Sequence, residues 1–219
     1  MKKKIVCFIP VRSKSKRLKN KNILKINGNP LIKVVCKNII KSKLINEFYI
    51  GSDSYKIYNQ IGKLKSKIFF FHRSNKSSTS LAPSELAIKE FLNKKKDIDI
   101  IVFLQATNPF VNYLDLDQAL KKLLRNNYDC ILSVVKSKKF LWKYEKFISP
   151  INYNYQNRQM SQNLKNYYVE NGSFYIFYKK NFLKYNNRLH KKIGSYEMKK
   201  ESLFEIDDQE DLRIVRKLV

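Results

Sequence analysis

Residues 5–22 have the sequence IVCFIPVRSKSKRLKNKN, in which an apolar run passes directly into a strongly basic one. The first part, IVCFI, is continuously apolar, as expected for a strand in a sheet that is covered on both faces. The second part carries six lysines and arginines between residues 12 and 21. This cationic loop has two interpretations, a site for a polyphosphate or a solvated loop in a very basic chain.

Strand-like and helix-like segments alternate along the rest of the chain. Further apolar runs rich in β-branched and aromatic residues lie at residues 48–51, 68–71, 98–104, 131–135 and 174–178. Helical spacing occurs at residues 31–40, 55–64, 83–92 and 114–124, and a final helix is expected at Gln209–Leu218. This order predicts an α/β fold, a mostly parallel sheet flanked by helices and joined by right-handed crossovers. Although the length would allow a small second lobe, we expect one domain over residues 1–219.

Residues 136–166 interrupt this pattern. Aromatic side chains, among them Trp142 and Phe147, are dispersed here among lysines and asparagines. We expect this segment to leave the sheet as an excursion that serves as a dimer arm or a lid. Stacking of nucleic-acid bases on these aromatic side chains is the less favoured alternative.

The composition indicates attraction to anions without specifying which. The net charge is +27, but only eight of the 45 basic residues are arginine. Because bidentate readers of phosphate and of bases are usually arginine-rich, we expect no specific nucleic-acid binding.

Other features favour a cytoplasmic protein. Cys7, Cys36 and Cys130 are odd in number and lie in apolar surroundings, as expected of reduced core residues. No segment has the ~20 apolar residues of a membrane span, and no signal peptide is expected. His72 and His190 lie beside basic residues and are expected at the surface.

Three polar clusters fall where predicted strands end. They are the basic loop, the SDS segment at residues 52–54 and the QATNP segment at residues 105–109. Because ligands of open parallel sheets bind outside the carboxyl ends of the strands, we expect these clusters to form one pocket. A Walker-type phosphate loop, which would end in Lys-Ser or Lys-Thr after glycines, is absent from the sequence.

Six segments, in order, resemble the N-acylneuraminate cytidylyltransferase family. IPVRSKSKRLKNKNI is similar to the family signature IPARGGSKGIPGKNI, and LQATNPF to LQPTSPL. NGNPLI, GSDS, NRQ followed by ENGSFYIF, and FEIDDQEDL resemble GGKPLI, STDS, NRQ followed by ENGAIYIT, and IDIDTEEDL. The resemblance implies a Rossmann-like nucleotidyltransferase that activates a nine-carbon acidic sugar with CTP and releases pyrophosphate. It also suggests a homodimer that uses the excursion.

The resemblance assigns roles to particular residues. It implies catalytic roles for Lys21 and Arg12, with Lys21 stabilising charge at the α-phosphate. It implies nucleotide contacts from Arg12, Ser15, Lys16, Lys21, Asn22, Arg73 and Gln105. It places Gln105, Arg158, Gln159, Asn171 and Tyr175 on or near the sugar.

The chemistry also calls for Mg²⁺, and Glu205 and Asp207 are the candidate ligands. Two residues apart in an extended segment, both carboxylates project from one face. Taken alone the pair is equally consistent with a solvated edge, and the resemblance favours metal binding. Asp208 and Asp211 are expected to cap the final helix.

The chain departs from the family pattern at several positions. Ser13, Lys14 and Arg17 replace glycines of the loop, so side chains are expected to do what backbone N–H groups usually do at phosphates. Ser80 stands where the family often has an acidic residue, and Glu205 where it has aspartate, so Asp207 is the stronger metal candidate. Two alternatives remain open, a Kdo-type or other sugar nucleotidyltransferase and a catalytically weak relative that binds polyanions.

Overall fold

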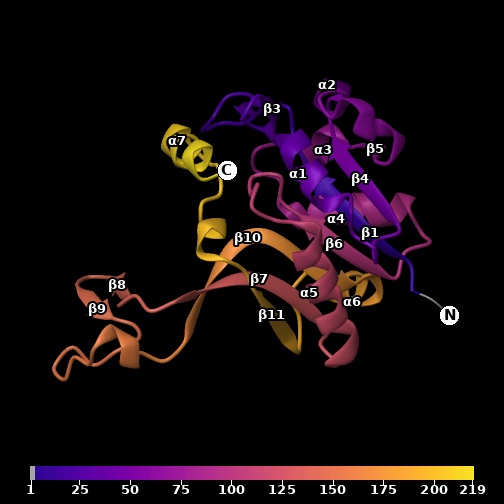
Figure 1. Ribbon diagram of the computed structural model, residues 1–219. Coiled ribbons are helices and arrows are strands. Elements are labelled where there is room, and N and C mark those ends of the chain that lie inside the picture. Colours follow the sequence, from indigo (N-terminus) through magenta and orange to yellow (C-terminus); the bar gives the residue numbers. More distant parts are fainter. Residues whose placement is uncertain (1–2) are drawn as a thin grey trace.

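A seven-stranded sheet runs through the centre of the computed structural model, which describes residues 3–219 (Figure 1). Its strand order is β11-β7-β10-β6-β1-β4-β5. The strands are β1 Ile5–Pro10, β4 Glu47–Ser52, β5 Phe69–His72, β6 Ile100–Leu104, β7 Cys130–Ser137, β10 Tyr167–Tyr178 and β11 Ile193–Glu197. All neighbouring pairs are parallel except those of β10, which is antiparallel to both β6 and β7. The predicted mostly parallel sheet is confirmed, whereas β11 and the reversed direction of β10 were not predicted.

Helices cover both faces of the sheet. One face packs against α1 Leu31–Ile39, α2 Tyr55–Asn59, α5 Tyr113–Arg125 and α7 Gln209–Leu218. The other packs against α4 Ser84–Lys94 and α6 Lys179–Tyr185, and the short α3 Asn75–Ser78 precedes α4. Along β1 the side chains of Cys7 and Ile9 enter the first core and those of Val6 and Phe8 the second. The continuous apolar strand is therefore buried on both faces, as predicted from its sequence.

Short elements complete the chain. The 3₁₀ turns are η1 Lys21–Ile23, η2 Gly62–Ser66, η3 Ser161–Asn163 and η4 Lys200–Leu203. Two small hairpins pair β2 Lys25–Ile26 with β3 Asn29–Pro30 and β8 Trp142–Tyr144 with β9 Ile148–Pro150. The helix expected at residues 55–64 ends early, because the chain turns at Gly62 with a φ of 60°.

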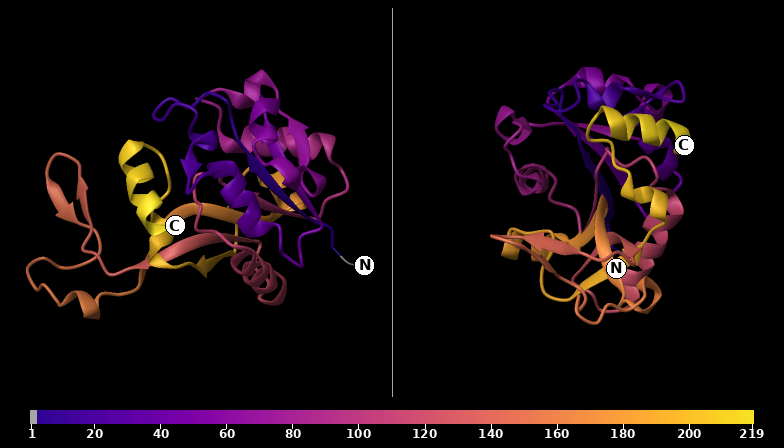
Figure 2. Two further views of the ribbon diagram at one scale, coloured as in Figure 1. Left: turned by 45° about the horizontal axis from the view of Figure 1, so that its top comes forward. Right: turned by 90° about the vertical axis from the view of Figure 1, so that its left-hand side faces the viewer.

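Residues 138–166 leave the sheet between β7 and β10 and extend away from the body of the molecule (Figures 1 and 2). This segment, which we call the arm, carries the β8–β9 hairpin and η3. Tyr144 and Phe147 are 78% and 75% exposed at its surface. The arm thus presents large apolar side chains to solvent, which is unusual for a surface without a partner.

The burial predicted for the three cysteines is confirmed, whereas the surface position predicted for His190 is not. Cys7, Cys36 and Cys130 are buried and unbridged, as expected. His190 is 7% exposed and stacks on Tyr185 with ring centroids 5.3 Å apart, so its expected surface position is wrong. Residues 3–219 contain no helix long and apolar enough to cross a bilayer.

Two contacts hold the C-terminal region against the rest of the molecule, one near the start of the chain and one after β6. Arg216 of α7 donates from Nη2 to the carbonyl oxygen of Lys25 at 3.0 Å. The backbone N–H of Ile206 donates to the carbonyl oxygen of Thr107, just after β6, at 2.9 Å. Residues 205–207 are therefore fixed beside the carboxyl ends of the central strands, where the basic loop also begins.

Candidate active site

A cavity of about 440 Å³ lies at the carboxyl ends of β1 and β6. The loop after β1, the segment around α3 and the residues after β6 contribute to its wall, together with Glu205 and Asp207. Nine of the residues given roles above line it, namely Arg12, Ser15, Lys16, Lys21, Asn22, Arg73, Gln105, Glu205 and Asp207. The polar clusters after β1 and β6 therefore share one pocket, as strand topology predicts. The SDS segment at residues 52–54 does not line it, so the expected contribution of this third cluster is wrong.

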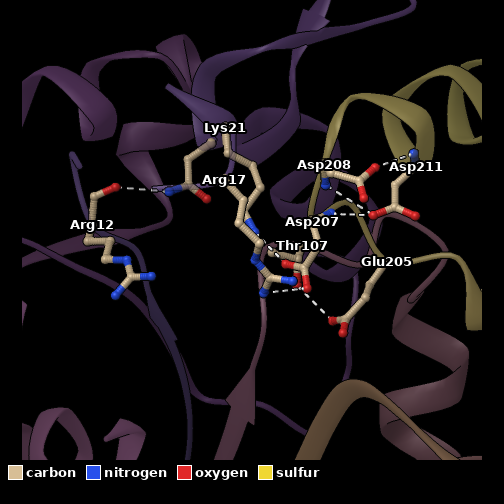
Figure 3. A network of polar contacts seen from close by, with 9 residues as sticks. Arg12, Arg17, Lys21, Thr107, Glu205, Asp207, Asp208 and Asp211 are labelled. Carbon is tan, nitrogen blue, oxygen red and sulfur yellow. Dashed lines mark hydrogen bonds and ion pairs between the residues drawn. The ribbon is translucent and has the colours of Figure 1, made fainter. Parts of the chain in front are cut away.

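Asp207 joins the basic loop to the C-terminal segment (Figure 3). Its Oδ1 accepts from Nζ of Lys21 at 2.9 Å, and its Oδ2 lies 2.7 Å from Nη2 of Arg17. Its backbone N–H donates to Oδ2 of Asp211 at 2.9 Å. The capping box of α7 thus fixes the backbone from which the Asp207 carboxylate reaches Lys21. The contact of Arg17 with Asp207 was not anticipated from the sequence.

The two carboxylates of the cavity differ in their electrostatics. Burial acts to raise the pKa of Asp207, but the hydrogen bond and charge of Lys21, with the charge of Arg17, hold that pKa below its ordinary value. Burial, together with the charge of Asp207, raises the pKa of Glu205, and the hydrogen bond from Thr107 opposes this. An additional cation beside Glu205 would stabilise its ionised form.

Thr107 and Gly172 shape the surroundings of Glu205. The Thr107 hydroxyl donates to Oε2 of Glu205 at 3.2 Å. Gly172 lies at the irregularity of β10 with a φ of 61°, and a Cβ there would lie only 2.9 Å from the same Oε2. The backbone conformation therefore favours glycine at this position, and a side chain there would displace the Glu205 carboxylate. Thr107 lies within the QATNP cluster, but nothing in the sequence indicated its contact with Glu205.

Three predicted nucleotide-site residues also hold the basic loop in place. Arg73 is 7% exposed and donates from Nη1 to the carbonyl oxygen of Val11 at 3.3 Å. Asn22 donates from Nδ2 to the carbonyl oxygen of Arg12 at 3.0 Å, and Arg12 donates from Nη1 to that of Thr79 at 3.1 Å. Burial lowers the pKa of Arg73, which the charges of nearby carboxylates oppose. The loop backbone is consequently held by side chains rather than by glycine-rich turns.

The structure does not bring four of the residues expected near the sugar to the cavity wall. Asn171 is 4% exposed, and its Nδ2 donates to Oγ of Ser202 at 2.8 Å. Tyr175 is 2% exposed and hydrogen-bonds through its hydroxyl to Glu170. Arg158 and Gln159 lie on the arm, where the Arg158 guanidinium is 4.2 Å from the centroid of the Phe140 ring. Within this chain, Asn171 has a structural partner and the arm residues lie outside the cavity.

The cavity has the charge distribution of a polyphosphate site. Five cationic side chains line it, from Arg12, Lys16, Arg17, Lys21 and Arg73, against the carboxylates of Glu205 and Asp207. Cations in fixed positions stabilise charge that develops during phosphoryl transfer. The two carboxylates are the cavity groups that could hold a divalent cation.

Fold and site together define a class, the Rossmann-like nucleotidyltransferases. A solved structure of CMP:2-keto-3-deoxy-manno-octonic acid synthetase complexed with CTP superimposes with a TM-score of 0.72 at 17% identity, covering 98% of each chain. A model of the cytidylyltransferase family matches residues 6–218, and the chain belongs to this family.

Curated relatives share this family. An N-acylneuraminate cytidylyltransferase A of Danio rerio is 31% identical over 93% of this chain and 48% of its own length. A pseudaminic acid cytidylyltransferase of Campylobacter jejuni is 28% identical over 97% of this chain and 95% of its own. The chain spans about half the length of the N-acylneuraminate cytidylyltransferases that it matches.

Proposed function

We propose that this chain transfers the cytidylyl group of CTP to an acidic nine-carbon sugar, which yields a CMP-sugar and pyrophosphate. One observation carries the proposal: Lys21 of the basic loop and Asp207 of the C-terminal segment are in contact, 2.9 Å apart, on the wall of one cavity. The relatives named for N-acylneuraminate and pseudaminic acid support the nucleotide and the sugar class.

In this reaction the anomeric hydroxyl of the sugar attacks the α-phosphorus of CTP and loses its proton, and the bond to pyrophosphate breaks. Negative charge increases on the α-phosphate and on the leaving pyrophosphate. Lys21 lies with 14% side-chain exposure and is oriented by Asp207, which suits a fixed charge at the α-phosphate. Arg12 and Lys16, on the same wall, suit the β- and γ-phosphates.

We propose Mg²⁺ as the cofactor, held by Asp207 and Glu205. Magnesium prefers oxygen ligands and is commonly bound by one or two carboxylates, with phosphate oxygens and water in the other positions. Glu205 and Asp207 both line the cavity, so the donor set that the cavity offers is a pair of carboxylates. Bound there, the ion would neutralise charge on the phosphates.

We also propose a homodimer in which the arm of one copy covers the cavity of the other. Its exposed Tyr144 and Phe147 supply apolar area for such a contact. Arg158 and Gln159 lie outside their own cavity, so a second copy could bring them to the sugar.

A cytoplasmic location is part of the proposal. The support is chemical, because three unbridged cysteines persist most readily in a reducing compartment.

The activity is tested by pyrophosphate release from CTP in the presence of Mg²⁺. Sialic, legionaminic and pseudaminic acids and Kdo are supplied one at a time, and release is expected with one of the three nine-carbon acids. Release with Kdo alone would assign the chain to the other branch of sugar nucleotidyltransferases. Absence of release with all four sugars would contradict the proposal.

The arm is tested by complementation between two inactive variants. Lys21→Ala removes the cavity cation and Arg158→Ala removes an arm residue. If the arm acts on the partner's cavity, mixed dimers contain one intact site, and activity returns after the two variants are mixed and allowed to exchange subunits. Light scattering that gives the mass of a monomer, or no recovery of activity from mixed dimers, would contradict the proposed arrangement.

A further inference from the structure

The carboxylate of Asp53, outside the cavity, accepts two hydrogen bonds from Ser13 at the start of the basic loop. We call this pair of contacts the clamp. Ser13, just after β1, donates from its backbone N–H to Oδ1 of Asp53 at 2.8 Å and from its hydroxyl to Oδ2 at 2.6 Å. Asp53 directly follows β4, which pairs with β1 in parallel. Both oxygens of one carboxylate therefore bridge the end of one strand to the loop that leaves its neighbour. Neither Ser13 nor Asp53 lines the cavity.

The clamp acts on the backbone at the position where the loop first faces the cavity. Side chains hold three successive residues: Arg73 holds the carbonyl of Val11, Asn22 that of Arg12, and Asp53 the N–H of Ser13. Arg12 lies between the two held neighbours, and its side chain is on the cavity wall. The direction of the Arg12 side chain therefore depends on a backbone that is fixed on both sides.

The hydroxyl of Ser13 makes a contact that the glycine of the family signature could not make. Ser13 stands where the family signature has glycine, and a glycine could supply only the backbone N–H. Ser13 has no positive φ, so serine occupies the position without strain. Hydrogen bonds to an ionised acceptor are stronger than neutral ones. A paired contact from serine thus stabilises a loop that lacks its usual glycines.

We propose that Asp53, acting through Ser13, is a positioning residue that fixes the entrance of the basic loop for binding of a nucleoside triphosphate. The proposal rests on the proposed function and adds a residue that does not touch the substrate. Asp53 holds the loop in its binding geometry before CTP arrives, so its loss should weaken CTP binding more than sugar binding.

The test compares Asp53→Ala, Asp53→Asn and Ser13→Gly with a control, Asp97→Asn. Asp97 is an exposed carboxylate paired with Lys4, and its side chain is 89% exposed. Asp53→Ala is expected to weaken CTP binding about tenfold and to raise KM for CTP by a similar factor, because it removes both hydrogen bonds. Asp53→Asn keeps one acceptor oxygen, so its affinity for CTP should lie between that of Asp53→Ala and that of the wild type. KM for the sugar should change less than twofold in each variant.

Ser13→Gly removes only the hydroxyl contact, and the double variant tests whether Ser13 and Asp53 act through the same contact. Ser13→Gly keeps the N–H contact and should weaken CTP binding about threefold. The variant with both Asp53→Ala and Ser13→Gly should bind no more weakly than Asp53→Ala alone, because the two residues act through one contact. Additive losses, or CTP binding unchanged in both single variants, would overturn the proposal.

Hydrogen exchange separates this proposal from the proposed function. Amides of residues 11–17 should exchange faster in Asp53→Asn and Ser13→Gly than in the wild type, and at the wild-type rate in Asp97→Asn. This result supports the clamp even if the wild type binds no CTP, in which case the proposed function fails. Exchange at the wild-type rate in both variants would overturn the clamp whatever the protein binds.

Discussion

Lys21 is a cation on the cavity wall that Asp207 holds in a fixed position, so its removal is the most informative single substitution. We expect Lys21→Ala to lower turnover about 10²- to 10³-fold, the effect of removing one preorganised stabiliser of transition-state charge. Lys19→Ala is the matched control, since Lys19 is an exposed lysine of the same loop. Steady-state pyrophosphate release measures both. Unchanged turnover in Lys21→Ala would remove Lys21 from the chemistry.

The raised pKa of Glu205 predicts how the stability of the protein depends on pH. Burial and the charge of Asp207 raise the pKa of Glu205 above its ordinary value of 4.5. The folded state therefore favours the protonated acid, and the stability this contributes is present below pH 4.5 and is lost as pH rises through the raised pKa. In the absence of Mg²⁺ and CTP, Glu205→Gln should therefore melt at a higher temperature than the wild type at pH 7.

The advantage of Glu205→Gln should shrink toward pH 4, where the wild-type carboxyl is also neutral. Thermal melts across this pH range measure the difference. A variant that is less stable than the wild type at pH 7 would show that the carboxylate is not destabilised in its site. Higher stability together with lost activity would be a stability–activity trade-off.

Sequence reasoning anticipated the residues of the cavity better than their partners. Topology placed the loop after β1 beside the cluster after β6, and resemblance added Glu205 and Asp207. Asn171 was expected near the sugar, yet its amide contacts Ser202. Such a contact joins segments far apart in the chain, so no local spacing indicates it. The contact of Arg17 with Asp207 escaped prediction for the same reason.

Helix α7 fixes one side of the site through its first turn. Asp208 accepts at Oδ1 from the N–H groups of Glu210 and Asp211, at 2.9 Å and 3.0 Å. Asp208→Ala should lower the free energy of unfolding by about 1 kcal/mol, the usual cost of losing an N-cap. Urea denaturation measures this. Asp208→Asn is the control and should remain near wild type because asparagine caps equally well; equal losses in both variants would argue against the cap.

At the level of elements, periodicity predicted the central strands and most helices but not their directions. The apolar runs at β1 and β6 are continuous, and burial on both faces explains why they were recognisable. The direction of β10 was not recognisable, because the arm and not a crossover helix separates it from β7. The segment IGSYE of β11 is short and contains Gly194, which weakens a strand signal.

The whole molecule carries a net charge of +27, and this predicts how it responds to salt. Lysine predominates on a broadly charged surface, so we expect binding to duplex DNA that is insensitive to sequence and falls steeply with salt as counterions are released. Such binding should vanish near physiological salt, whereas pyrophosphate release from CTP should persist there. Fluorescence anisotropy with labelled DNA measures the first. Tight binding at physiological salt would instead favour a polyanion-binding function.

The central claim is that the loop after β1 and the carboxylates before α7 hold one CTP. The most direct measurement is the anomalous scattering of Mn²⁺ in crystals grown with CTP. We predict a manganese peak in contact with Asp207 and Glu205, with the triphosphate extending from that ion to Lys21 and Arg12. A nucleotide bound in this cavity with no metal at either carboxylate, or a nucleotide bound elsewhere, would contradict the account.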